Sequence, residues 1–151
     1  MEAPCATWRE NLSLRRRTSV PIIWDELALN EEDILQIASD DGAEGIGLKI
    51  SKNAGLTKCR RQRDICLAAG YTMSIQDTTG SDIAFAAIVH LGQTIPKKYH
   101  RCILDCRDMV SVKTADGEFE VTNGFVSAPK SFGLGITPRL DVLGDPVISY
   151  N

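Results

Sequence analysis

The chain has 151 residues, the length of one domain, and its composition of 43% hydrophobic and 25% charged residues is ordinary for a globular protein. No apolar run approaches the roughly 18 residues that cross a bilayer, and the first residues have neither the basic nor the apolar part of a secretory leader. The net charge of −3 at pH 7 gives no electrostatic footprint for nucleic acid. We therefore expect a cytoplasmic protein that binds neither membranes nor nucleic acid.

Short apolar segments alternate with helical segments over the first two thirds of the chain. Strands are predicted at residues 1–5, 20–24, 45–50, 71–76 and 101–105, with helices at 6–17, 30–42 and 57–69 and a buried helix opening at Ser81. Asn30, Thr57 and Ser81 are residue types that cap helix N-termini, and Gly70 is placed to end a helix.

Strands that alternate with helices predict an α/β fold with right-handed parallel crossovers. Units of about 23 to 28 residues favour a closed β/α barrel over an open sheet, and a complete barrel needs about 250 residues. Residues 1–109 are therefore expected to form part of a barrel. Residues 110–151 are expected to form a hairpin over 110–126, with its turn at Asp116-Gly117, and a tail that packs on the barrel.

The cysteines indicate reduced thiols and no zinc site. They are odd in number, form no CxxC pair and lie in or beside apolar segments, which predicts core thiols. The five are Cys5, Cys59, Cys66, Cys102 and Cys106.

An ionisable residue stands at the end of each predicted strand: Glu2, Asp25, Lys49, Asp77 and Asp105. In a β/α barrel these positions line one shared pocket. A single Asp after a strand is usually a turn or cap residue, but charged groups at a barrel mouth lose hydration unless other groups compensate them. The complete set therefore indicates a functional site.

Glu2 and Asp25 offer the hard oxygen ligands that Mg²⁺ prefers, and Glu26 is expected to support them from just outside the ligands. Lys49 on the next strand would lie beside the cation and be partly desolvated. Its pKa is therefore expected to fall toward neutrality, so that it can act as a general base.

Asp77 and Asp105 are expected to bind the substrate. They could form an anionic wall opposite the metal, which favours a substrate with an ammonium group, such as an amino or imino acid.

Several segments resemble the enolase superfamily, in particular the mandelate racemase/muconate lactonizing enzymes. MEAPC and PIIWDE resemble the family's fourth and fifth strand ends, which carry the second and third metal ligands, and GLKISKNAGLTKCRRQRDICLAAG is similar to the sixth strand and helix of the muconate-lactonizing subgroup. That strand carries an acid/base lysine, which falls on Lys49. SAPKSFGLGITPRLDVLG resembles the segment that returns toward the capping domain. The resemblance implies the C-terminal part, about strands 4–8, of a modified TIM (β/α)7β barrel.

The chain departs from the family in two ways. Ala54-Gly55 stands where the family has a double glycine after the sixth strand. The capping domain, the second-strand KxK lysine and the third-strand Asp that completes the metal triad have no counterpart in the chain. We therefore expect either a truncated, catalytically incomplete product or one half of an assembly.

The resemblance implies Mg²⁺-dependent abstraction of the proton α to a carboxylate, through an enediolate. EAPCATW and ILDCRDM look most similar to the family's cis-3-hydroxy-L-proline dehydratases, which form a pyrroline-2-carboxylate. Racemisation or epimerisation of a proline or proline-betaine type substrate is the alternative, and a non-catalytic fragment or half-barrel partner is the alternative of another class. The full-length protein is expected to be a homo-oligomer.

Overall fold

In the computed structural model of the chain, residues 1–77, 80–117 and 119–150 are described. A parallel sheet with the order β1-β2-β3-β4 forms its centre. The strands are β1 (Ile23–Trp24), β2 (Gly45–Lys49), β3 (Thr72–Gln76) and β4 (His100–Ile103). Glu2 forms a parallel bridge with Ile23 and so extends the sheet beyond β1. The predicted α/β fold with a parallel sheet is confirmed.

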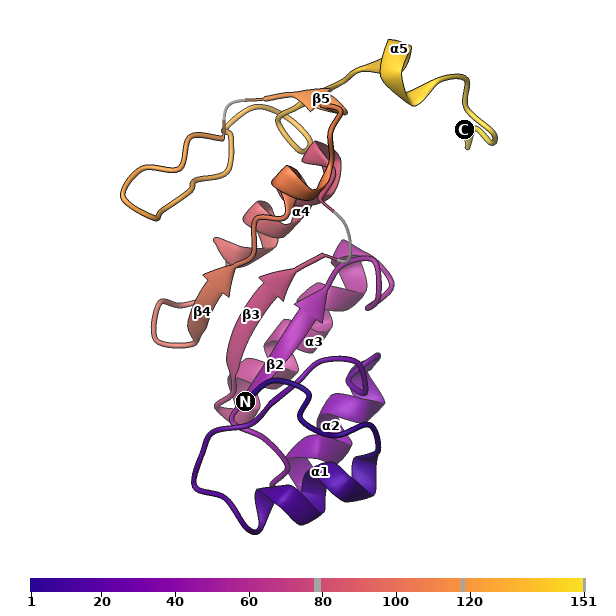
Figure 1. Cartoon of the computed structure of the whole chain (residues 1–151). Coiled ribbons are helices and arrows are strands. Elements are labelled where there is room, and N and C mark those ends of the chain that lie inside the picture. The colour runs from indigo at the N-terminus through magenta and orange to yellow at the C-terminus, as the bar shows by residue number, and fades with distance from the viewer. Residues whose placement is uncertain (78–79, 118, 151) are drawn as a thin grey trace.

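Helices connect the strands and cover one face of the sheet. They are α1 (Trp8–Arg15), α2 (Glu31–Ser39), α3 (Leu56–Ala69) and α4 (Asp82–Gly92). Figure 1 shows α3 and α4 behind the sheet, with α1 and α2 at its lower end. Each strand therefore has one face toward the helices and one face away from them, which we call the barrel-facing side because it would line the interior of the predicted barrel.

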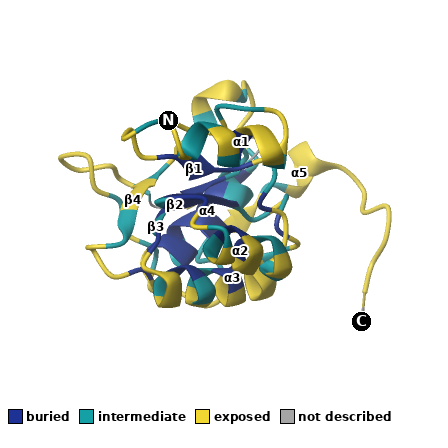
Figure 2. Ribbon diagram, turned by 90° about the horizontal axis from the view of Figure 1, so that it is seen from below, coloured by how far each residue is buried: buried dark blue, intermediate teal, exposed yellow. Residues whose placement is uncertain are grey.

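The alternation of side chains along β2 illustrates this division. Ile46 and Leu48 are fully buried and belong to the main hydrophobic cluster together with side chains of α2 and α3. Because successive side chains point to opposite faces of a strand, Gly45, Gly47 and Lys49 share the other face. The buried strands form the dark centre of Figure 2. The barrel-facing side thus presents small and polar residues.

Local sequence signals fix most helix ends. Asn30 and Ser81 are the N-caps of α2 and α4, as predicted, and Gly70 ends α3 at a φ of 79°. The prediction of Thr57 as a cap is wrong. Helix α3 begins at Leu56, after Gly55 at a φ of 90°, without a side-chain cap. The turn before α3 sets this start, because it is held by contacts to the rest of the site, described below.

The predicted hairpin over 110–126 is wrong. Asp116, expected in its turn, lies in β5 (Ala115–Asp116), which pairs antiparallel with β6 (Thr137–Pro138). A bidentate ion pair fixes this distant pairing, because Arg139 Nη2 and Nε donate to the Asp116 carboxylate at 2.6 and 3.0 Å. The C-terminal region also contains the 3₁₀ helix η1 (Arg107–Met109) and α5 (Leu140–Leu143), and Figure 1 shows α5 far from the sheet.

All five cysteines are free thiols. Cys59, Cys66 and Cys106 are buried, as expected for core thiols, and Cys5 is partly buried. Cys102 is exposed, which corrects its assignment to the core. It pairs with Ser74 in the sheet, and alternation along β4 places it on the face opposite the half-buried Ile103, where no helix covers it. Among the described residues, no helix has both the length and the apolar character to cross a membrane.

Candidate active site

The centre of the candidate site is the Asp25 carboxylate at the end of β1. Its side chain is only 5% exposed, and two lysine ammonium groups share it. Lys49 Nζ lies 2.5 Å from Oδ2, and Lys52 Nζ lies 2.7 Å from Oδ1. Burial raises the pKa of Asp25, but the hydrogen bonds and charges of the two lysines outweigh burial and lower it. Asp25 is therefore held as a carboxylate.

Lys52 makes more contacts than Lys49. Its ammonium group also donates to the main-chain oxygen of Asp25 at 2.5 Å and to that of Gly47 at 3.2 Å. Lys49 has a second, longer ion pair with Glu26 at 3.6 Å. Glu26 therefore lies beside the site, as expected, and its contact is with the lysine.

The fall in the pKa of Lys49 is predicted for a lysine beside a bound cation, and the protein groups by themselves act in the opposite direction. Burial lowers the pKa of Lys49, but the hydrogen bond and charge of Asp25, with smaller contributions from Glu26 and Glu2, outweigh burial and raise it. For Lys52, burial dominates and the pKa is lowered despite the contact with Asp25. Lys49 is thus held in its charged form.

The turn between β2 and α3 places both lysines. Asn53 is fully buried, and its Oδ1 accepts a 2.9 Å hydrogen bond from the Lys49 main-chain N–H. Its Nδ2 donates to the main-chain oxygens of Ala28 and Leu29 at 2.8 and 3.1 Å. One amide side chain therefore ties the end of β2 to the loop that follows β1.

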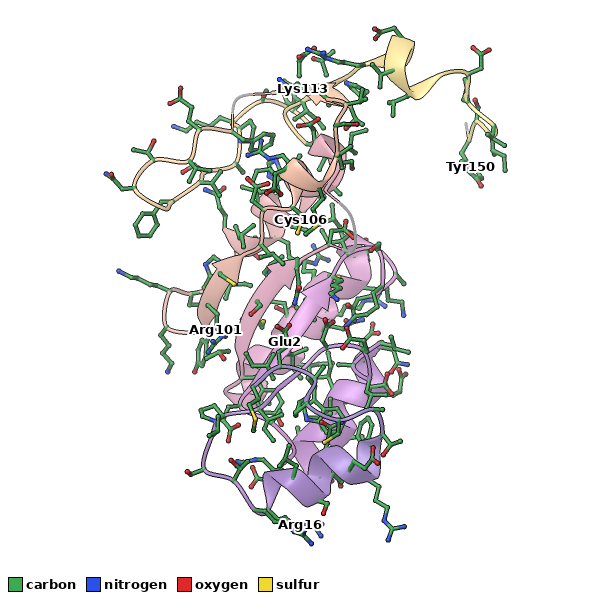
Figure 3. The ribbon with its side chains drawn as sticks, viewed as in Figure 1. Glu2, Arg16, Arg101, Cys106, Lys113 and Tyr150 are labelled. Carbon is green, nitrogen blue, oxygen red and sulfur yellow. The ribbon has the colours of Figure 1, made fainter. Side chains whose placement is uncertain are left out.

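Glu2 is joined to β3 across the barrel-facing side of the sheet. Gln76 Nε2 donates a 3.0 Å hydrogen bond to Glu2 Oε1. Gly47 makes this contact possible, because a Cβ atom at that position would lie 2.8 Å from Gln76 Nε2. Figure 3 shows Glu2 in front of the sheet beside β2.

The two predicted substrate carboxylates have partners of their own. Asp77 accepts a hydrogen bond from the Ser51 hydroxyl. Asp105 forms a bidentate pair with Arg107, at 2.9 Å from Nε and 2.7 Å from Nη2. The pKa of Asp105 is lowered, first by the Arg107 side chain. The Arg107 guanidinium also stacks on Phe85, 3.9 Å from the ring centre. The negative charge of the Asp105 carboxylate is therefore already balanced by the Arg107 guanidinium.

Sequence reasoning missed three residues of this site: Lys52, Asn53 and Gln76. Lys52 follows Lys49 by three positions in a polar turn, where a lysine is normally solvated. Gln76 precedes the strand-end Asp77 and carries no charge. Only the placement of Lys49 on a strand end, followed by a tight turn, could have drawn attention to the first two.

The carboxylates present fit a magnesium ion only in part. Glu2 and Asp25 supply hard oxygen atoms at neighbouring strand ends. In residues 1–77, 80–117 and 119–150, however, no three His, Cys, Asp or Glu side chains are close enough together to hold a metal ion. The two carboxylates therefore fit as part of a ligand set that needs at least one further group.

Comparison with known proteins agrees with this fold. The family model described as "Enolase C-terminal domain-like" matches residues 1–142. The chain belongs to this family. A cis-3-hydroxy-L-proline dehydratase from Roseibium aggregatum is 40% identical over all 151 residues of the chain, which cover 41% of that protein.

Solved structures of enolase superfamily enzymes show the same relationship. A structure from Aspergillus oryzae, described as a mandelate racemase/muconate lactonizing enzyme, is 70% identical with a TM-score of 0.95, covering 99% of this chain and 41% of that one. Another so described, from Roseovarius nubinhibens in complex with magnesium, is 46% identical with a TM-score of 0.95 and the same coverage. The chain thus spans about two fifths of these relatives and corresponds to their C-terminal barrel region.

Proposed function

We propose that this enolase superfamily chain contributes the acid/base Lys49 and two metal-binding carboxylates to a dehydratase that converts cis-3-hydroxy-L-proline to a pyrroline-2-carboxylate. The observation that carries the proposal is the contact of 2.5 Å between Lys49 Nζ and Asp25 Oδ2 at the carboxyl ends of adjacent strands. It brings an acid/base group to one of the carboxylates expected to bind the metal. The 40% identity with the Roseibium dehydratase supports the choice of substrate.

Lys49 would move a proton at one face of the substrate. The pair with Asp25 raises the pKa of Lys49 and so keeps its ammonium group protonated. A ligand that displaces Lys49 from Asp25 Oδ2 would leave this ammonium group free to give its proton to the departing β-hydroxyl group, which leaves as water. Lys49 can accept a proton only after this ion pair loosens. A bound Mg²⁺, held in part by Glu2 and Asp25, would stabilise the negative charge that develops on the substrate carboxylate.

The elimination breaks the α-C–H bond and the β-C–O bond of the hydroxyproline and forms a ring double bond. The hydroxyl group leaves as water with the proton from Lys49, and the α-proton would pass to a base outside this chain, the second-strand lysine that the resemblance to the family implies. Asp77 and Asp105 were expected to attract the ring ammonium group. We propose this role for both carboxylates, and the Asp105 carboxylate would be shared between the substrate and Arg107.

A hybrid enzyme tests the proposal. In the Roseibium dehydratase, this chain replaces the matching 41% of the sequence, and the hybrid is incubated with Mg²⁺ and cis-3-hydroxy-L-proline in D2O. We expect formation of the pyrroline product, abolished by Lys49→Ala in a hybrid that still folds. Exchange of the α-proton of proline betaine without any pyrroline product would instead support an epimerase.

The same measurements on the 151-residue chain alone test the alternative that this chain is a non-catalytic half of an assembly. Two carboxylates without a third ligand should bind Mg²⁺ weakly. A chain that binds Mg²⁺ tightly and turns over the hydroxyproline by itself would contradict the view that it needs a partner.

A further inference from the structure

The two lysines on Asp25 are not equivalent in their surroundings. The Lys52 ammonium group has three acceptors: Asp25 Oδ1 at 2.7 Å and the main-chain oxygens of Asp25 and Gly47 at 2.5 and 3.2 Å. An ammonium group has three N–H donors, so each of them has a partner within the protein. Lys49 reaches Asp25 through Oδ2, and its other ion pair within residues 1–77, 80–117 and 119–150 is the longer contact with the exposed Glu26.

The backbone that carries Lys52 is also fixed. Asn53, directly after it, is fully buried and ties the turn to the main chain at Lys49, Ala28 and Leu29. Ala54 follows with a φ of 63°, a conformation that persists only where the surrounding structure determines it. On this fixed backbone, the Lys52 ammonium group cannot leave Asp25 Oδ1 without also losing its two main-chain acceptors, whereas Lys49 would lose only its contacts with the carboxylates of Asp25 and Glu26.

From this asymmetry we infer that Lys52 is a positioning residue that permanently holds Asp25 Oδ1, so that only Oδ2 is offered to the reaction site and Lys49 is its exchangeable partner. This inference rests on the proposed function only for the identity of the ligand that displaces Lys49. Without Lys52, both carboxylate oxygens of Asp25 would be open to Lys49. A Lys49 ammonium group paired with both oxygens would compete more strongly with a cation for Asp25.

Nitrogen-detected NMR of the lysine ammonium groups in the wild-type chain tests the inference without any substitution. We expect the Lys52 ammonium protons to exchange slowly with water, with a signal that Mg²⁺ leaves unchanged, while the Lys49 signal responds to Mg²⁺. Lys58, which is 48% exposed on α3, is the fast-exchanging reference. Exchange at Lys52 as fast as at Lys58 would overturn the inference.

The outcomes separate the proposed metal-binding role of Asp25 from the anchoring of Asp25 by Lys52. A protected Lys52 signal together with a Lys49 signal that does not respond to Mg²⁺ would contradict the metal-binding role of Asp25 and leave the anchoring by Lys52 supported. A response of both signals to Mg²⁺ would overturn the anchoring, because Lys52 would then exchange as well.

The variant Lys52→Met gives a second readout that a purely structural role would not change. We expect its dissociation constant for Mn²⁺, measured by electron paramagnetic resonance, to rise at least tenfold, and its crystal structure to show Asp25 turned with both oxygens toward Lys49. Lys58→Met, the matched control, should leave both unchanged. An unaltered Asp25 conformation, or tighter Mn²⁺ binding, would contradict the inference. If Lys52→Met does not fold, the wild-type NMR measurement still decides.

Discussion

Gln76 Nε2 donates a 3.0 Å hydrogen bond to Glu2 Oε1 although 74 residues separate them in the sequence. The contact passes over β2 at Gly47, where the absence of a side chain leaves room for the amide. It orients the carboxylate of Glu2, an exposed residue that lies beside β1 at the side edge of the sheet. The uncharged Gln76 thus positions one of the two carboxylates proposed to bind the metal.

Gly47→Ala is expected to break this contact. The new Cβ atom would lie 2.8 Å from Gln76 Nε2 and 3.4 Å from Asp25 Cβ and Cγ, so the amide must move while the strand stays in place. We expect a loss of about 1–2 kcal/mol in the free energy of unfolding, measured with urea. In a Gln76→Ala background the same substitution should cost less, because the obstructing amide is gone. Equal costs in both backgrounds would contradict the role assigned to Gly47.

Asn53→Ala should be among the most destabilising substitutions in the turn. It removes three hydrogen bonds, to Lys49, Ala28 and Leu29, each with a net contribution of about 1 kcal/mol, and we expect a loss of about 3 kcal/mol in urea unfolding. Asn53→Asp keeps the acceptor for the Lys49 N–H but places a carboxylate against two carbonyl oxygens. It should therefore be at least as destabilising as Asn53→Ala, and a milder effect would contradict the assigned contacts.

The sequence predicted those parts of the site that depend on strand position. Asp25 directly follows β1 and Lys49 is the last residue of β2, so the alternation of elements places both at the carboxyl ends of neighbouring strands. Lys52 could not be predicted, because its role depends on a turn that folds back on β1. The β5–β6 pairing was missed for a related reason. Asp116-Gly117 is a local turn signal, whereas the ion pair with Arg139 that decides the pairing joins distant segments.

Arg107→Met should raise the pKa of Asp105 toward its ordinary value of 3.8, because the Arg107 side chain is the main cause of its lowering. A carboxyl group whose pKa is lowered by folding contributes stability above its unfolded pKa, and this stability is lost as the pH falls through the folded pKa. The variant should therefore lose less stability than the wild type on acidification below about pH 4. Carbon NMR titration of Asp105 checks the direction, and an unchanged titration would contradict the pairing.

Burial of Cys66 predicts a loss of stability at alkaline pH. Burial raises the pKa of the Cys66 thiol from 9.0 to about 12, so above pH 9 the unfolded chain releases a proton that the folded chain retains. The contribution is complete below pH 9 and is lost as the pH rises toward 12. Cys66→Ala should show a shallower decline of the unfolding midpoint over this window. The exposed Cys102, replaced by Ala as the control, should leave the decline unchanged.

Ala54→Gly should stabilise the chain, in contrast to most glycine substitutions. Ala54 has a φ of 63°, where a Cβ atom costs about 1–2 kcal/mol, while the extra freedom of glycine in the unfolded chain costs about 0.4–1 kcal/mol. The balance predicts a gain of about 0.5–1 kcal/mol in urea unfolding. Ala69→Gly, at the last residue of α3, has no such strain to relieve and should lose stability. If Ala54→Gly also destabilised the chain, Ala54 would not be strained, and the rigidity assigned to the turn that carries Lys52 would rest on Asn53 alone.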